Sequence, residues 1–311
     1  MIETVVRKAL ELWGMEGADV SLAAHRENTV FRLGFQGLDY ALRLHCPGYR
    51  NRFELQSELE WMNWLKTNGL RTPEPVTSGN GSLCHKIDGI VVDVLSWLDG
   101  ETLTRKMQSA SADELDTIFL SLGRTMAELH NKSDEWDVPN GFQRPSWNLE
   151  GLVGEAPVWG RFWENPVLTP EQCEKLVDAR AAARELLDTR APQLDYGLIH
   201  ADIIPDNVLV SGSETSLIDF DDGGFGFRLF DLATTLNKIP GGGKGVDCQS
   251  AFLKGYQSVR QIDLACLPLF SALRSFTYIG WIMTRLDQPD AKARLQKFLA
   301  AAELHFSVLK E

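Results

Sequence analysis

Cysteine is scarce in this sequence, and no two cysteines have the close spacing of a zinc-binding pair. Five scattered thiols favour neither a disulfide framework nor a zinc site, so we expect them to be reduced. A long apolar run is also missing, because none reaches the roughly 18 residues of a membrane-spanning helix. The first eight residues lack the basic-then-apolar order of a signal peptide. We therefore expect a cytoplasmic protein with no membrane partner. The cysteines are Cys46, Cys84, Cys173, Cys248 and Cys266.

Positive charge is in deficit. The chain has 31 lysines and arginines against 43 aspartates and glutamates, which gives a formal net charge of −12. Nucleic acids and anionic membranes are bound by basic surfaces, so this balance disfavours both as partners. It is compatible with a cationic substrate. With 311 residues, 44% of them hydrophobic, the chain can bury a substantial core in one large domain or two lobes.

A glycine-rich phosphate-binding motif is missing as well. Three consecutive glycines occupy positions 241–243, but the lysine and serine of a P-loop do not follow them. They therefore predict a loop and no phosphate-binding site.

The pattern of apolar residues divides the chain into two parts. The first hundred residues predict two β-hairpins, 29–35 with 40–44 and 82–86 with 90–95, beside two helices. The remainder predicts mostly helices. We therefore predict an α+β fold of two lobes: a small N-lobe with an antiparallel sheet (1–96) and a larger, mostly helical C-lobe (97–311). Helices are expected at 1–14, 53–67, 112–130, 170–187, 265–284 and 291–308.

The segment from His200 to Asp222 carries the chemistry. Asp202 follows a short apolar strand, Asn207 lies five residues later, and Asp219 twelve residues after that. Strands at 208–210 and 216–218 would form a hairpin whose open end places Asn207 beside Asp219. Phosphoryl transfer needs this set, because Asp202 can accept a hydroxyl proton while Asn207 and Asp219 hold Mg²⁺. The alternative is an acidic turn next to an unrelated acidic loop.

The run from Gly197 to Asp202 with Asn207, followed by Leu217 to Asp222, resembles the aminoglycoside phosphotransferase and choline kinase superfamily, which shares the protein-kinase fold. Ala127–His130 and Phe230–Ala233 match further family segments. The resemblance implies an ATP- and Mg²⁺-dependent kinase. In it Asp202 is the catalytic base, Asn207 and Asp219 are the metal ligands, and His200 braces the catalytic loop.

The nucleotide side departs from the family pattern. Arg43 stands where a strand lysine is expected; we predict that it pairs with Glu58 and holds the phosphates, the alternative being a strand-surface arginine. The residues around Asn28 occupy the position of the glycine-rich loop without its glycines, and Asn28 is predicted to shape a turn over the nucleotide. Ser96 lies at the lobe junction, where adenine would bind; a plain hydrophobic strand end is the alternative.

Several features indicate a small acceptor. Ile204 replaces the lysine of protein kinases, and eleven residues between Asp219 and Asp231 leave no room for an activation loop. Eight acidic residues against one basic residue over 195–231 favour an amine-bearing alcohol: an amino alcohol, a hydroxy amino acid such as homoserine, or an aminoglycoside.

Three further residues are predicted to contact the acceptor. They are Asp221 and Asp222, for which a second metal or a solvated loop are alternatives, and Arg274, which a structural ion pair explains as well. Tryptophans 147, 159, 163 and 281 could hold an ammonium group by cation–π contact, or pack in the core. Within the family, the type II homoserine kinases and the bacterial stress-response kinase are most similar. A protein Ser/Thr kinase and a regulatory pseudokinase are the alternative functions.

Overall fold

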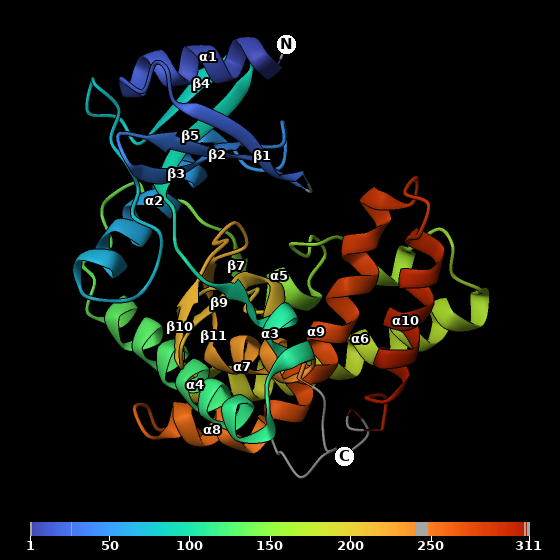
Figure 1. The fold of residues 1–311 in the computed structure, drawn as a ribbon. Coiled ribbons are helices and arrows are strands. Elements are labelled where there is room, and N and C mark those ends of the chain that lie inside the picture. The colour runs from blue at the N-terminus through green and yellow to red at the C-terminus, as the bar shows by residue number, and fades with distance from the viewer. Residues whose placement is uncertain (1, 26, 240–247, 308, 310–311) are drawn as a thin grey trace.

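The structure is a computed structural model that describes residues 2–25, 27–239, 248–307 and 309. The glycine run at 241–243, predicted as a loop, lies outside these residues. The chain forms an α+β fold of two lobes, with a sheet-containing N-terminal lobe above a larger helical lobe (Figure 1). The predicted fold class is therefore confirmed. Among the described residues, no helix is long and apolar enough to cross a membrane.

The N-terminal lobe is built on a five-stranded antiparallel sheet in the order β1-β2-β3-β5-β4. Both predicted hairpins are present, as β2–β3 and β4–β5. The strand β1 was missed, because all seven of its residues are exposed and it lies at the sheet edge. The strands are β1 (Asp19–His25), β2 (Thr29–Phe35), β3 (Leu38–Leu44), β4 (Cys84–Ile87) and β5 (Ile90–Ser96).

Two helices flank this sheet. Helix α1 (Ile2–Trp13) buries Val5, Ala9 and Trp13 in one cluster with the sheet's apolar side chains. Helix α2 (Arg52–Thr67) lies between the sheet and the C-terminal lobe, and its Leu59 and Met62 pack in the core shared with helix α4 (Ala112–Asp134). Asn51 and Glu54 close a capping box that fixes where α2 begins.

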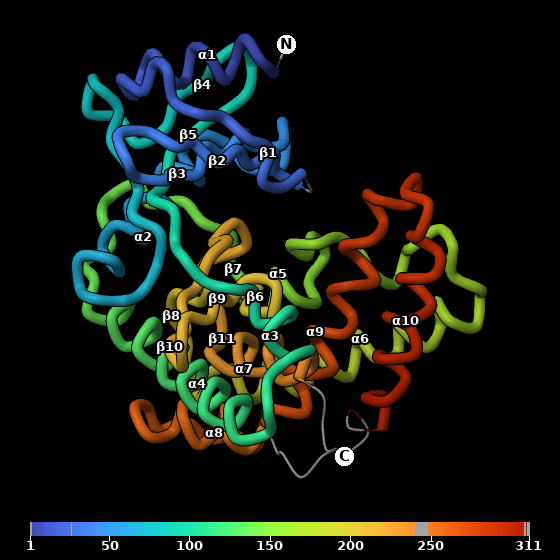
Figure 2. Tube along the Cα trace, viewed as in Figure 1, coloured from blue at the N-terminus to red at the C-terminus, as the bar shows by residue number. Residues whose placement is uncertain are grey.

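A short connecting segment leaves the N-terminal lobe after β5 and runs down to β6 on the larger lobe (Figure 2). The predicted boundary at residue 96 coincides with the end of β5, and as a domain boundary it stays a prediction. In the larger lobe α4 packs along α8, and α9 packs against α7 and α10. These helices are α3 (Leu103–Ser109), α5 (Leu149–Val153), α6 (Pro170–Arg190), α7 (Arg228–Leu236), α8 (Cys248–Gln257), α9 (Leu267–Trp281) and α10 (Ala291–Glu303).

Two small three-stranded sheets lie at the top of the larger lobe, where it faces the N-terminal sheet. One pairs β10, β9 and β6, and the other pairs β7, β11 and β8. Their short strands end in the loops that carry the candidate site. The strands are β6 (Glu101–Thr102), β7 (Ser146–Trp147), β8 (Tyr196–Ile199), β9 (Val208–Ser211), β10 (Glu214–Leu217) and β11 (Gly224–Phe227).

Candidate active site

The loop after β8 is held by the buried carboxylate of Asp231. Asp231 on α7 accepts hydrogen bonds from the backbone N–H groups of His200, at 2.8 Å, and Ala201, at 2.6 Å. Ala201 has a φ of 63°, an uncommon conformation that these two bonds hold in place. Burial lowers the pKa of His200, so the imidazole is neutral and bonds the Ile218 carbonyl at 3.1 Å. His200 is thus placed to brace the loop.

Asp202 lies at the tip of this loop with both carboxylate oxygens bound. Its Oδ2 accepts from Asn207 Nδ2 at 2.9 Å, and its Oδ1 accepts from Arg274 Nη2 at 2.5 Å. Burial raises the pKa of Asp202 to about 6, against the opposing effect of the Arg274 charge. A carboxylate with this pKa is ionised at neutral pH and basic enough to take a proton from a hydroxyl group.

The hairpin of β9 and β10 brings the other two predicted residues together. Leu217 pairs with Val208, so the strand ends meet, and Ile218 N–H donates to the Asn207 carbonyl at 3.0 Å. Asp219 comes directly after this pair, with a φ of 67°. A left-handed conformation costs a non-glycine residue roughly 1–2 kcal/mol, so the surroundings must hold it there.

Asp219 lies in an excess of negative charge. Desolvation by the surrounding protein and the nearby carboxylates of Asp221, Asp202 and Asp222 raise the pKa of Asp219 well above its usual value. A divalent cation would relieve this repulsion. Asn207 commits its amide nitrogen to Asp202, which leaves its oxygen as the atom a hard cation takes. Over the described ranges no three His, Cys, Asp or Glu side chains form a metal-binding group.

Arg43 and Glu58 form an ion pair, with Nη1 and Oε1 2.9 Å apart and both side chains buried. The pairing expected from the sequence is therefore present. Arg43 also makes a bidentate pair with Asp93, at 2.8 and 3.0 Å, and His45 Nε2 lies 2.5 Å from the same carboxylate. Sequence reasoning missed Asp93 and His45. These bonds use three of the five N–H groups of the Arg43 guanidinium.

Asn28 and Ser96 both bind other parts of the chain through their side chains. Asn28 Nδ2 donates to Asp221 Oδ2 at 2.5 Å, and Asn28 Oδ1 accepts from the Cys46 N–H at 3.1 Å. The turn between β1 and β2 therefore touches the loop that carries Asp219. Ser96 Oγ accepts from the Glu74 N–H at 2.8 Å, which anchors the end of β5 at the lobe junction.

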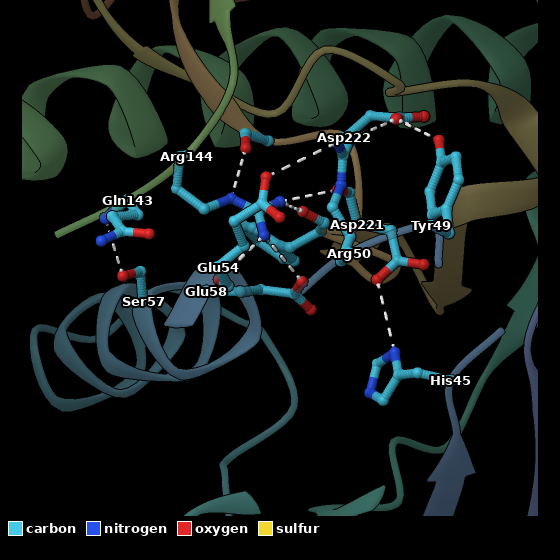
Figure 3. Close-up of polar contacts among 12 residues, drawn as sticks. His45, Tyr49, Arg50, Glu54, Ser57, Glu58, Gln143, Arg144, Asp221 and Asp222 are labelled. Atoms are coloured by element: carbon cyan, nitrogen blue, oxygen red, sulfur yellow. Dashed lines mark hydrogen bonds and ion pairs between the residues drawn. The ribbon is translucent and has the colours of Figure 1, made fainter. Parts of the chain in front are cut away.

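Asp221 and Asp222 point toward groups of the N-terminal lobe (Figure 3). Asp222 Oδ1 accepts from Tyr49 Oη at 2.7 Å, from Arg50 Nη2 at 3.1 Å and from Trp159 Nε1 at 3.3 Å. The two carboxylates are buried. They join the metal loop, residues 219–223, to the segment between β3 and α2.

Arg274 is fully buried on α9, and its guanidinium stacks on aromatic rings. Its Cζ lies 4.5 Å from the ring centroid of Trp159, 4.4 Å from that of Tyr278 and 5.4 Å from that of Phe230. One nitrogen, Nη2, binds Asp202 and Tyr278. In the part of the chain that the structure describes, Nε and Nη1 are buried without a hydrogen-bond partner. Both interpretations of Arg274, an ion pair and a carboxylate ligand, are compatible with this arrangement.

Two further arginines that bridge distant parts of the chain were not predicted. Arg285 contacts Glu27 across the lobes, with Nη2 and Oε1 2.9 Å apart. Arg144, in the loop between α4 and β7, binds both α2 and the metal loop (Figure 3). Neither residue lies in a motif or in a periodic segment, so no local signal marks them.

Similarity to known proteins extends over most of the chain. Residues 20–267 match the model of a phosphotransferase enzyme family. A homoserine kinase of Sinorhizobium medicae is 31% identical over 297 residues, which cover 91% of this chain and 85% of that protein. A microcompartment-associated aminopropanol kinase superposes with a TM-score of 0.81 and 28% identity, covering 99% of this chain and 96% of the other. An amicoumacin kinase solved with AMP-PNP, Ca²⁺ and Ami superposes with a TM-score of 0.78 and 24% identity, covering 97% of this chain and 92% of the other.

Proposed function

The chain belongs to the phosphotransferase enzyme family and is a small-molecule kinase, and from this premise we propose that it transfers the γ-phosphoryl group of ATP to the hydroxyl of a small, amine-bearing alcohol. The observation that carries the proposal is the position of Asp202. Its carboxylate is held between Asn207 and Arg274, and Asn207 is in turn bonded to the residue before Asp219. We place the enzyme in the cytoplasm, where ATP is abundant.

In the proposed reaction Asp202 orients the acceptor hydroxyl and takes its proton as the phosphoryl group arrives. The amide N–H of Asn207 binds one oxygen of the Asp202 carboxylate, and Arg274 binds the other. Together they fix the orientation of the carboxylate. Positioning of this kind supplies much of the catalysis in phosphoryl transfer, since the protein forms no covalent bond.

Asn207 and Asp219 are proposed to hold Mg²⁺. The bound cation would neutralise charge on the transferring phosphates. Arg43 is proposed to hold the phosphates, with Glu58 keeping its guanidinium in place. Asn28, on the turn after β1, is proposed to lie over the nucleotide, and Ser96 to mark the adenine position at the lobe junction.

The acceptor is proposed to be a hydroxy amino acid such as homoserine or an amino alcohol, ahead of an aminoglycoside. Relatives of the chain are named for homoserine and aminopropanol, which are short amine-bearing alcohols. The two unpartnered nitrogens of Arg274 favour a carboxylate on the acceptor. Asp221 and Asp222 would then act on the ammonium group through their charge. One oxygen of each already accepts a hydrogen bond, from Asn28 and Tyr49, while Asp221 Oδ1 has no hydrogen-bond partner among the described residues.

The tryptophan faces give less support to an aromatic ammonium site than the sequence suggested. Arg274 already lies over the Trp159 ring, while Arg285 and Arg294 lie 4.0 and 4.7 Å from the centroid of the Trp281 ring. These rings are occupied by cations of the chain itself. We therefore propose that charge, and not a cation–π cage, recognises the amine.

A protein substrate is disfavoured by the short connection after the metal loop. Strand β11 begins at Gly224 and pairs at once with β8, and α7 begins at Arg228. The stretch from Asp219 to Asp231 thus carries no segment that could act as a platform for a peptide. A pseudokinase is disfavoured because Asp202, Asn207 and Asp219 are all present and adjacent.

A panel of matched acceptors tests the proposal through ADP release at saturating Mg·ATP. Homoserine carries the hydroxyl, amine and carboxylate, 3-aminopropanol lacks the carboxylate, and 4-hydroxybutyrate lacks the amine. We expect 4-hydroxybutyrate to be the poorest substrate by kcat/KM. Equal use of 4-hydroxybutyrate and homoserine would contradict recognition of the amine, and no ADP release with any alcohol would contradict the kinase proposal.

A further inference from the structure

Arg144 has a completely buried side chain whose guanidinium joins α2 to the metal loop (Figure 3). It lies in the loop between α4 and β7, outside the segment that carries Asp202 and Asp219. All three of its guanidinium nitrogens donate hydrogen bonds, and every acceptor belongs to α2 or to the metal loop.

On one side, Arg144 binds the backbone of the metal loop. Nη2 donates to the carbonyls of Phe220 and Asp221, each at 2.7 Å, and Nε donates to the carbonyl of Gly223 at 2.6 Å. These carbonyls come directly after Asp219. Gly224, the first residue of β11 directly after this loop, lies so close to the arginine's own segment that a β-carbon there would overlap the Pro145 carbonyl oxygen. The path of the loop is therefore set by Arg144 and its neighbour.

On the other side, Arg144 binds α2. Nη1 lies 3.2 Å from Glu58 Oε2 and 3.1 Å from the Glu54 carbonyl. The second oxygen of Glu58 binds Arg43 on β3 at 2.9 Å, so the carboxylate is shared between two arginines. The backbone N–H of Gln143 also donates to Ser57 Oγ at 2.9 Å, which seats the loop on the helix.

Resting on the function proposed above, we propose that Arg144 is a positioning residue that fixes the metal loop relative to the Arg43–Glu58 pair. Its hydrogen bonds go to α2 and to the backbone of the metal loop, and none of them goes to the side chain of Asp202 or Asp219. Its planar fork reaches four carbonyls and one carboxylate at once, which a lysine cannot do. Loss of Arg144 would release the loop that carries Asp219 from the helix that carries Glu58. The residues proposed to hold the metal and the phosphates would then no longer be fixed relative to one another.

Hydrogen exchange on the nucleotide- and metal-free enzyme tests this directly. We expect Arg144→Met to speed exchange at least tenfold in peptides covering 219–224, whose Gly223 N–H is bonded to the Phe220 carbonyl at 2.9 Å. Arg180→Met is the matched control. Arg180 lies on α6, and it also donates to backbone carbonyls, which are those of Val153 and Gly154. It should leave 219–224 unchanged. Unchanged exchange in Arg144→Met, or a uniform increase over the whole chain, would overturn the proposal.

Kinetics supply a second readout. In Arg144→Met the half-saturating Mg²⁺ concentration should rise at least tenfold while the KM of the acceptor changes less than twofold, and Arg144→Lys should restore part of the loss. A fall in melting temperature with wild-type Mg²⁺ dependence would indicate a merely structural role and refute positioning.

A milder change covers the case in which Arg144→Met does not fold. Ser57→Ala removes only the hydroxyl that accepts from the Gln143 N–H. It should still speed exchange in 219–224 by twofold or more, and wild-type exchange there would count against the proposal. Because the exchange experiment needs no substrate, it decides on Arg144 even if no acceptor is phosphorylated.

Discussion

Replacing Arg274 with methionine should move the acid limb of the pH–rate profile to higher pH. Arg274 Nη2 lies 2.5 Å from Asp202 Oδ1, and the guanidinium has no exposed side-chain surface. Its positive charge stabilises the ionised carboxylate and so lowers the pKa of Asp202, while burial raises that pKa to about 6. Methionine keeps an unbranched apolar chain that can pack against the rings but removes the charge.

The size of the effect can be derived from the contact. A charge-assisted hydrogen bond contributes roughly 1.5–3 kcal/mol, and one pKa unit corresponds to about 1.4 kcal/mol. The pKa of Asp202 in Arg274→Met should therefore rise by about one to two units, to roughly 7–8. Since the ionised form accepts the proton, at pH 7 the ionised fraction would fall from roughly nine tenths to between about a half and a tenth.

The assay is kcat/KM for the acceptor between pH 5 and 9, at saturating Mg·ATP. Tyr278→Phe is the control, because it removes a hydroxyl 3.0 Å from the same Arg274 nitrogen and leaves the ion pair intact. We expect the control to keep the wild-type acid limb and Arg274→Met to recover activity as the pH rises. Coincident acid limbs in the wild type and Arg274→Met would refute the assigned coupling between Arg274 and Asp202.

Three further predictions concern Asp219, Arg43 and His130. Asp219→Asn should weaken Mg·ATP binding by at least tenfold in calorimetry yet leave the melting temperature equal or higher, because the raised pKa of Asp219 means that its ionised form costs stability at pH 7; an unchanged affinity would argue against its role. Arg43→Met should lower the free energy of unfolding by roughly 3–5 kcal/mol, since Asp93 and Glu58 lose a buried partner; a loss under about 1 kcal/mol in denaturant titration would contradict this. Burial lowers the pKa of His130 to about 4, so the unfolded chain takes up the proton first and stability falls between pH 6.5 and 4, by on the order of 3 kcal/mol. His130→Gln should flatten that slope in urea midpoints, and an unaltered slope would refute the assignment.

Local sequence patterns predicted those parts of the molecule that depend on neighbours in the chain. The hairpin of β9 and β10 is closed by a short turn, so the spacing between Asn207 and Asp219 was enough to expect them side by side. Strand β1 was missed because an exposed edge strand buries neither face and shows no alternation.

Contacts between distant segments could not be predicted in this way. Asp93 faces Arg43 only because β3 pairs with β5 in one register, across 50 residues of chain. Arg144 comes from a loop and reaches the metal loop 76 to 79 residues away. A spacing rule contains no information on such partners, since they depend on strand register for Asp93 and on how distant segments pack together for Arg144. The partners of Asp222 Oδ1, which are Tyr49, Arg50 and Trp159, were not predictable either, and a role of Asp222 toward the acceptor stays a prediction.

The measurement that tests the central claim most directly is phosphoryl transfer by Asp202→Asn, with an acceptor that the wild type uses. Asparagine keeps the shape of the side chain and cannot take a proton. We predict that kcat falls by roughly 10²–10⁴-fold, while the affinity for Mg·ATP, measured separately by calorimetry, stays within a few-fold of the wild type. Wild-type turnover in Asp202→Asn would contradict the assignment of Asp202 as the catalytic base.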